Sequence, residues 1–98
     1  IVDMALKVEN MRNYYSKIAW MMDNGIPVRH EHAMAKLYIC QAAFEVTDDA
    51  MQVLGGMGYM MAARVQRLWR DVRVMRIGGG TDEIMYNIAG PQLLKNYK

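Results

Sequence analysis

The sequence has 98 residues, a formal net charge of +2 and one cysteine. A chain of this length forms one domain at most, and so small a charge does not indicate a polyanionic partner. A single cysteine excludes an intrachain disulfide bond and fits a reducing compartment. Hydrophobic residues make up 53% of the chain, which is high for so small a body. We therefore expect part of this apolar surface to pack against a partner or against further parts of a longer chain.

Residues 2–24 have the pattern of an amphipathic helix. Apolar side chains recur at alternating spacings of four and three residues, which places them on one helical face. These side chains are Met4, Val8, Met11, Tyr15, Ile18 and Met22. Gly25 accepts the left-handed conformation that ends helices, and Pro27 cannot rejoin the helix. The first helix is therefore predicted to end at Asn24.

A second helix is predicted from Val28 or Arg29 to Leu54. The same spacing continues along it, and Gly55 and Gly56 stop it. Its apolar stripe consists of Ala33, Leu37, Cys40, Phe44, Thr47, Met51 and Leu54. Each of the two helices has a length of ~35 Å, and the short turn between them makes an antiparallel hairpin. Helices of this length indicate a larger helical bundle.

The next segment combines a short amphipathic helix with five regularly spaced arginines. The helix is predicted from Ala62 to about Val72, and its apolar side consists of Val65, Leu68, Trp69 and Val72. The arginines recur every three residues, as Arg64, Arg67, Arg70, Arg73 and Arg76. Such a stripe is compatible with nucleic-acid binding. Ion pairs to neighbouring elements, together with solvated guanidinium groups, explain it better, because buried apolar residues interrupt it and no aromatic platform accompanies it. No nucleic-acid partner is expected.

The last helix has a clear start signal. Thr81 is a good N-cap, because its side-chain oxygen can accept a hydrogen bond from the first turn. Asp82 and Glu83 then place negative charge in that turn, where the helix dipole favours it. Gly90-Pro91 should end or kink this helix before a terminal turn over residues 92–97. No strand is predicted. The fold class is all-α, an antiparallel up-and-down helical bundle of two long helices and two shorter ones.

Six of the eight glycines fall in two short segments, residues 54–59 and 76–84. Glycine lets the backbone adopt positive φ, and without a Cβ it lets a ligand approach the peptide groups closely. Each segment lies beside a helix end, where unpaired N–H groups can bind an anion or a cofactor. Neither is a known nucleotide fingerprint, because no Lys-Ser or Lys-Thr follows the triple glycine and no strand precedes the first segment. Taken singly, each is also explained as an interhelical turn.

Other reactive side chains do not indicate a site. His30 and His32 lie two apart at a helix start and point to different sides, without a cysteine or carboxylate cluster, so solvated histidines and no metal site are expected. Cys40 lies in an apolar stripe without a nearby base and is expected to be a buried, inert thiol. No apolar run approaches the ~18–20 residues of a membrane span.

Three motifs follow one another along the chain. They are Gln52-x-x-Gly55-Gly56-x-Gly58-Tyr59, Arg67-Leu68-x-Arg70-Asp71-x-Arg73 and Ile77-x-x-Gly80-Thr81-x-Glu83-Ile84. In this order, with these helix lengths and the ending Asn96-Tyr97-Lys98, they resemble the C-terminal helical domain of the acyl-CoA dehydrogenases. The resemblance covers essentially the whole chain. It implies that residues 1–98 are this domain without its first helix, and that the family's N-terminal helical and middle β domains lie upstream of Ile1.

The resemblance implies a flavoprotein with FAD as cofactor and an acyl-CoA thioester as substrate. In the family, a carboxylate removes the α-proton of the thioester while the β-hydrogen passes as hydride to the flavin. The electrons then leave to an electron-transfer flavoprotein. The resemblance also implies a homotetramer in the cytoplasm, or in the mitochondrial matrix of a eukaryote. The segment alone is expected to be inactive.

Carried over by position, the family's cofactor contacts fall on both glycine segments. Gln52, Gly55 and Gly56 would contact the adenosine-diphosphate part of an FAD held by a neighbouring subunit. Thr81 and Glu83 would meet the adenosine end of FAD at the start of the last helix. The Glu83 carboxylate suits a ribose hydroxyl better than a phosphate.

Position 79 departs from the family pattern. Many members have a glutamate directly before the Gly-Thr pair as the catalytic base, whereas this chain has Gly79. Glycine has no side-chain proton acceptor, so the chain holds no catalytic residue, and the base is expected upstream of Ile1, as in members resembling the long-chain and isovaleryl branches. The Gly79 N–H is retained, and in the family this amide polarises the thioester carbonyl. Gly79 and Gly80 are therefore expected to contact the substrate.

Two alternatives stay open. One is a non-enzymatic helical interaction module, in which the glycine segments are plain turns and the arginines meet an acidic partner. The other is an inactive or oxidase-like relative of the family, since Gly79 cannot act as the base.

Overall fold

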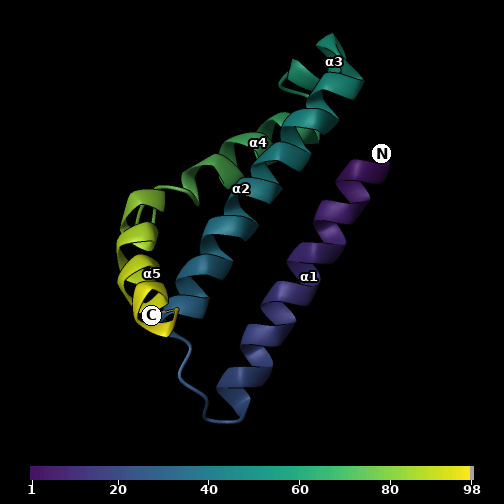
Figure 1. Ribbon diagram of the computed structural model, residues 1–98. Helices are drawn as coiled ribbons and strands as arrows, with labels where there is room; N and C mark the ends of the chain where they lie inside the picture. Colours follow the sequence, from purple (N-terminus) through teal and green to yellow (C-terminus); the bar gives the residue numbers. More distant parts are fainter. Residues whose placement is uncertain (98) are drawn as a thin grey trace.

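The helix α2 (Arg29–Leu54) is the central element of the chain, because every other helix contacts it (Figure 1). The computed structural model describes residues 1–97. Within them α1 (Val2–Asp23) lies along one side of α2, while α4 (Arg64–Val74) and α5 (Asp82–Asn96) lie along the other. The short helix α3 (Gly56–Tyr59) follows the end of α2. The all-α bundle with two long helices is confirmed, and the one-turn α3 is an addition to the expected elements.

The two long helices form the predicted antiparallel hairpin. Their ends agree with the prediction to within a residue, and Gly25 in the connection has a positive φ of 69°. The rings of Tyr14 and Tyr38 stack with centroids 6.1 Å apart. Nearer the free end of α1, Lys7 Nζ lies 2.7 Å from the Glu45 carboxylate. The hairpin is therefore held by contacts along its length.

The buried face of α1 differs from the predicted one in its second half. Tyr15 and Met22 were expected to face α2, but their side chains are 58% and 60% exposed. Tyr14 and Met21 are half-buried instead. Only α2 covers α1 in the described part of the chain, so the buried seam is narrow. In a helix of 3.6 residues per turn, either of two adjacent positions can continue such a seam, and the spacing pattern alone does not choose between them.

A buried hydrophobic cluster lies between α2 and α5. Ala33 and Leu37 of α2 form a buried cluster with Met85 and Ala89 of α5, and Met34 and Ile88 border it. The predicted stripe of α2 is buried at its beginning, whereas Leu54 at its end is 52% exposed. Small residues allow α5 to approach α2 closely at this point. This contact positions the glycine run that precedes α5.

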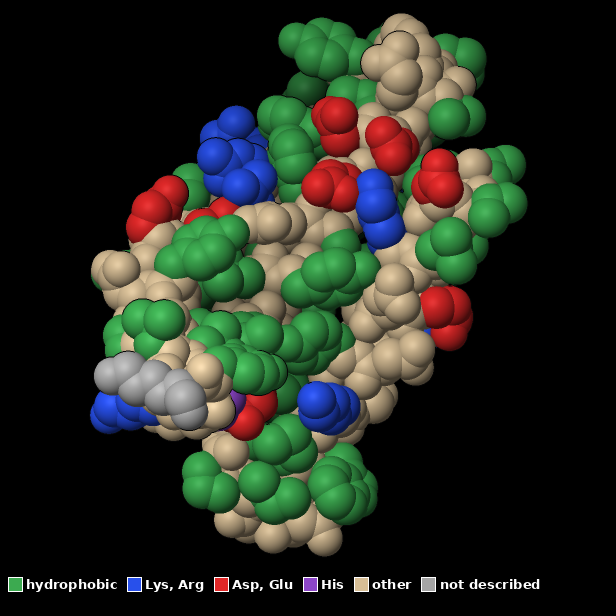
Figure 2. Space-filling view, viewed as in Figure 1, with side chains coloured by type: hydrophobic (Ala, Val, Ile, Leu, Met, Phe, Trp, Pro, Cys, Tyr) green, Lys and Arg blue, Asp and Glu red, His purple; other side chains and the backbone are tan. Residues whose placement is uncertain are grey.

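Much of the apolar surface remains exposed. The molecule measures 49 × 23 × 23 Å with a radius of gyration of 15.7 Å, against ~13 Å for a compact domain of this size. Trp20 is 61% exposed and Leu6 58%. Figure 2 shows hydrophobic side chains across much of the face that it displays. This exposed apolar surface is consistent with the expectation that part of it packs against a partner or against further parts of a longer chain, which stays a prediction.

The last helix runs farther than predicted. Gly90-Pro91 does not end it, and α5 continues through Pro91 to Asn96. Proline lacks the N–H of one helical hydrogen bond, and its ring normally clashes with the Cβ of the preceding residue. Here that residue is Gly90, which has no Cβ, so part of the clash is absent. Lys98, which completes the terminal triplet of the resemblance, lies outside the described residues.

Replacing Leu37 by alanine should weaken the contact between α2 and α5. Loss of this buried side chain is expected to lower the free energy of unfolding by ~2–3 kcal/mol. Leu94 on α5 is 70% exposed, and Leu94→Ala should change that free energy by less than ~0.5 kcal/mol. Urea unfolding followed by far-ultraviolet circular dichroism measures both variants. Equal losses would mean that the stabilising contact lies elsewhere.

Stability should also depend on the Cys40 thiol at alkaline pH. Burial raises the pKa of Cys40, while the nearby Lys36 opposes this shift. The unfolded chain, with an ordinary thiol pKa of ~8.5, then loses its proton first, so stability falls as the pH rises above that value. Cys40→Ala lacks the thiol and corrects for the other titrating groups. The wild type should lose stability relative to Cys40→Ala as the pH rises above the ordinary thiol pKa of ~8.5; a difference that stays constant above that pH would contradict the assignment.

Candidate functional site

The two glycine segments lie at separate places along α2. The first follows the last residue of α2, and the second is tied to Lys36 in its first half. The 19 residues from Lys36 to Gly55 correspond to ~28 Å of helix. The structure therefore does not bring the two predicted groups of site residues together within one chain. Instead, the chain offers two distinct surfaces.

At the first surface, the fold explains two of the three glycines. Gly55 has a φ of 62° where α2 ends, which requires glycine. A Cβ on Gly58 would lie 2.9 Å from the Met51 carbonyl oxygen, so close packing excludes a side chain. Gly56 has no positive φ, and a Cβ there would meet nothing within 4 Å. Gly56 and the neighbouring Gln52 are both exposed, so packing within this chain does not demand glycine at position 56.

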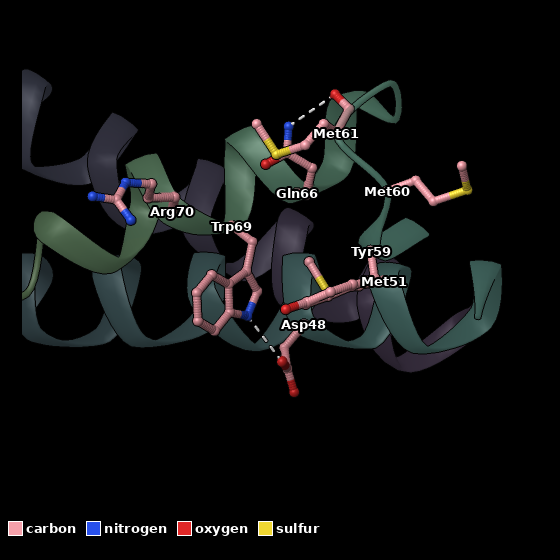
Figure 3. Close-up of a pocket in the computed structure, with 8 residues that line it drawn as sticks. All are labelled: Asp48, Met51, Tyr59, Met60, Met61, Gln66, Trp69 and Arg70. Atoms are coloured by element: carbon pink, nitrogen blue, oxygen red, sulfur yellow. Dashed lines mark hydrogen bonds between the residues drawn. The ribbon is translucent and has the colours of Figure 1, made fainter. Parts of the chain in front are cut away.

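A cavity of about 440 Å³ lies close to this surface, between α2, α4 and the segment that joins α3 to α4 (Figure 3). Trp69 Nε1 donates a hydrogen bond of 2.9 Å to Asp48 Oδ1 at its wall. Gln66 Nε2 donates to the Met61 carbonyl oxygen at 3.2 Å. The lining residues are Asp48, Met51, Tyr59, Met60, Met61, Gln66, Trp69 and Arg70. The sequence pattern gives no signal for this cavity, because its lining comes from α2, α3, α4 and the segment that joins α3 to α4.

At the second surface, the backbone itself is the principal feature. Gly79 and Gly80 have φ values of 69° and 109°, a region that other residues rarely adopt. Lys36 Nζ donates hydrogen bonds to the carbonyl oxygens of Gly78, at 3.0 Å, and Gly80. A Cβ on Gly79 would have only Lys36 Cε near it, at 4.0 Å. Gly79 is exposed, and its N–H donates no hydrogen bond to another described residue.

The start of α5 is fixed by a cap and by a buried carboxylate. Thr81 Oγ1 accepts a hydrogen bond from the Ile84 N–H at 3.3 Å, which confirms the predicted N-cap. Asp82 is only 8% exposed. Its Oδ2 accepts from Arg76 Nε at 2.8 Å and from Gln41 Nε2 at 3.4 Å. The Asp82 N–H donates in turn to the Arg76 carbonyl oxygen at 3.1 Å.

The arginine stripe divides between structural contacts and solvent. Arg76 forms the ion pair with Asp82, and both Arg73 and Arg76 lie over the Phe44 ring, 5.9 and 6.0 Å from its centroid. The Phe44 ring also packs against Trp69 at 5.4 Å. The remaining members Arg64, Arg67 and Arg70 are exposed. This division agrees with the interpretation of the stripe as contacts to neighbouring elements together with solvated guanidinium groups.

The sequence pattern does not single out two polar residues of the second surface, Lys36 and Gln41, and it marks Asp82 only as an acid in the first turn of the last helix, not as a buried carboxylate. Lys36 gives the best signal in retrospect. It directly precedes Leu37, a member of the predicted apolar stripe, and a lysine beside a buried face needs a hydrogen-bond acceptor. The acceptors are backbone carbonyls, so no second side chain marks the pair.

One histidine differs from its prediction. His30 is not fully solvated, since its Nδ1 lies 3.1 Å from Glu31 Oε2 and both side chains are half-buried. His32 is exposed. Within residues 1–97, no three potential ligands lie close enough to hold a metal ion. No helix in the same range has both the length and the hydropathy to cross a membrane.

Comparison with known proteins identifies the family to which the chain belongs. Residues 1–94 match the family model described as acyl-CoA dehydrogenase, C-terminal domain. The probable acyl-CoA dehydrogenase YdiO of Escherichia coli K12 is 56% identical over 95 residues, which are 97% of this chain and 25% of that protein. The chain thus spans about a quarter of the length of the curated relatives it matches.

Solved structures agree with the family match. The crystal structure of an acyl-CoA dehydrogenase from Slackia heliotrinireducens superposes with a TM-score of 0.94 at 43% identity, over 98% of this chain and 26% of that one. The butyryl-CoA dehydrogenase of Megasphaera elsdenii gives a TM-score of 0.91 at 34% identity, over 95% of this chain and 24% of that one. The chain belongs to the acyl-CoA dehydrogenase family, as a C-terminal domain of that family.

Proposed function

We propose that this chain is the C-terminal helical domain of an FAD-dependent enzyme that removes hydrogen from the α and β carbons of an acyl-CoA thioester. The observation that carries the proposal is the exposed Gly79 N–H, which has no hydrogen-bond partner among the described residues. The family resemblance implies that this amide binds the thioester. An oxyanion-type site needs donors that are fixed before the reaction and aimed at the developing charge. The fixed glycine run supplies such a donor.

In this proposal, Gly79 and Gly80 contact the substrate. The Gly79 N–H donates to the thioester carbonyl oxygen, which acidifies the α-proton by stabilising the enolate that forms when the proton leaves. The chain itself supplies no base, because position 79 has no side chain, and the carboxylate comes from an upstream segment. The open space above Gly79 also leaves room for a bulky or branched acyl chain.

Both surfaces are suited to FAD, which when bound accepts the β-hydrogen of the substrate as hydride. Gly56 offers a peptide group that a nucleotide can approach closely, with Gly55 and the Gln52 amide beside it. Thr81 and Glu83 lie at the positive end of α5, where the adenosine end of a cofactor can meet the exposed Glu83 carboxylate. We assign these five residues to FAD binding.

The separation of the surfaces supports a shared cofactor site. With ~28 Å of α2 between them, one chain serves two FAD molecules more readily than one. Gln52, Gly55 and Gly56 then contact the FAD of a neighbouring subunit, as expected of a homotetramer. The exposed apolar faces are consistent with cover by other subunits and by other parts of a longer chain. We further propose that electrons pass to an electron-transfer flavoprotein and that the enzyme is cytoplasmic.

The alternatives have their own support. The large exposed apolar area also fits a non-enzymatic interaction module, and the glycine at position 79 also fits an inactive or oxidase-like relative. Gly56 weighs against the module, because neither its φ nor its packing demands glycine. A relative without activity is separated from an active enzyme only by assay of the full-length protein.

The full-length protein should purify with a flavin absorbance spectrum and oxidise one class of acyl-CoA. A panel of straight and branched acyl-CoA substrates, with an electron-transfer flavoprotein as acceptor, measures the activity. Reduction of molecular oxygen instead would identify an oxidase. Residues 1–98 alone should show no turnover, since they hold no base. Absence of flavin from the full-length protein would exclude the enzyme.

Alanine at Gly56 and alanine at Gly58 should affect different properties of the full-length protein, namely FAD affinity and stability. Gly56→Ala meets no atom of this chain within 4 Å, so it should change stability by less than ~1 kcal/mol while lowering FAD affinity. Gly58→Ala forces a Cβ against the Met51 carbonyl and should cost ~1–3 kcal/mol of stability. Thermal unfolding and the flavin content after gel filtration measure the two effects. Full flavin retention by Gly56→Ala would remove position 56 from the cofactor site.

A further inference from the structure

We propose that Lys36 is a positioning residue for the thioester site: it aims the Gly79 N–H at the substrate carbonyl by holding the peptide to which that N–H belongs. The inference rests on the proposed function, since it concerns the same amide. Lys36 does not touch the substrate in this account. It acts only through the backbone of the Gly78–Gly80 run.

The direction of the Gly79 N–H follows from the planarity of the peptide bond. In a trans peptide, the carbonyl of one residue and the N–H of the next point in opposite directions, and the described residues contain no cis peptide. Lys36 Nζ binds the Gly78 carbonyl oxygen at 3.0 Å. The N–H of Gly79 must therefore point away from Lys36 and from α2. The same relation turns the Thr81 N–H away, because Lys36 also binds the Gly80 carbonyl.

Little else in the described chain fixes the middle of this run. The backbone hydrogen bonds around it involve the N–H groups of Ile77, Gly78 and Asp82, but not those of Gly79 or Gly80. Glycines at positive φ have wide conformational freedom, so without an anchor the Gly78–Gly79 peptide could rotate. Lys36 is that anchor, with one ammonium group on two carbonyls.

The packing of α2 fixes the position from which Lys36 extends. Lys36 lies in α2 between the buried residues Ala35 and Leu37, so the backbone from which its side chain extends is held by the packing of α2. The ends of the run are closed independently by Arg76 and Asp82, through the ion pair of 2.8 Å and the backbone hydrogen bond of 3.1 Å. The Arg76–Asp82 pair therefore holds the termini of the loop, and Lys36 sets the orientation of the peptide between them.

The charge of Lys36 adds to the positioning. A carbonyl that accepts a hydrogen bond from an ammonium group is polarised, and the N–H of the same peptide then becomes a stronger donor. Gly79 shares its peptide with the carbonyl of Gly78, which is the one bound by Lys36 at 3.0 Å. An uncharged replacement loses both the orientation and this polarisation, whereas arginine retains the charge.

The test uses the full-length enzyme with its flavin bound and compares Lys36→Met with Lys36→Arg. Lys17→Met is the matched control, since Lys17 is an exposed lysine on α1. The first readout is the infrared carbonyl stretch of a bound enoyl-CoA product labelled with carbon-13 at the thioester, which is not turned over by the oxidised enzyme. The second is the effect of each variant on kcat and on KM.

In the wild type and in Lys17→Met, the carbonyl stretch should fall below its frequency in free solution. In Lys36→Met it should return most of the way to the free value, and kcat should fall about 10- to 100-fold with KM changed much less. Lys36→Arg should recover part of both. A purely structural lysine would change the unfolding temperature and the flavin content but leave the carbonyl frequency of the bound ligand unaltered.

Two other results would contradict either the role of Lys36 or the proposed function. A wild-type carbonyl shift and kcat in flavin-loaded Lys36→Met would overturn the role of Lys36 while leaving the proposed function intact. An unshifted carbonyl in the wild type itself would instead remove the Gly79 donor, and with it the function proposed above. If Lys36→Met does not hold flavin, Lys36→Gln replaces it, because its amide can bind one carbonyl; an intermediate shift then supports the inference, and an unchanged shift overturns it.

Discussion

The hydrogen bonds from Lys36 to the carbonyl oxygens of Gly78 and Gly80 hold the glycine run before α5 in place. They join the one helix that all others contact to a loop whose three glycines would otherwise be free to change conformation. The buried contact between α2 and α5 provides the support on which this connection depends. Without this buried contact, the distance from the Lys36 ammonium group to the carbonyl oxygens of Gly78 and Gly80 would not be fixed.

Hydrogen bonds and ion pairs allow the Lys36 ammonium group and the Asp82 carboxylate to lie close to the core. An ammonium group or a carboxylate taken from water needs compensating hydrogen bonds. Lys36 finds two carbonyls, and the Asp82 carboxylate finds the Arg76 guanidinium and the Gln41 amide. Asp82 also lies in the first turn of α5, where the helix dipole favours its negative charge. Both groups are thus compensated within a few residues of the glycine run.

The elements were predictable where the signal is local. Thr81 caps α5 as its position before two acidic residues predicts, and the long helices end where glycine follows them. The exposure of Tyr15 depends instead on which side of α1 its one neighbour covers, and the continuation of α5 past Pro91 depends on the missing Cβ of Gly90. Lys36 and Asp82 acquire their roles from residues about forty positions away. Spacing along one helix contains no information about such pairs. The two glycine segments, in contrast, were recognised from the sequence because they are part of the family motifs.

Position 79 shows why the loss of a side chain need not remove a backbone site. A residue with a Cβ at φ 69° would adopt an unfavourable conformation, at a cost on the order of 1 kcal/mol or more. Glycine removes that strain together with any acid–base group. The N–H is unchanged, since its direction is set by the carbonyl on the other side of the same peptide and by Lys36 beneath it. In the proposed function the donor and the base are therefore separable parts of the chemistry, so that the base can lie on another helix while the thioester is bound at the Gly79 amide.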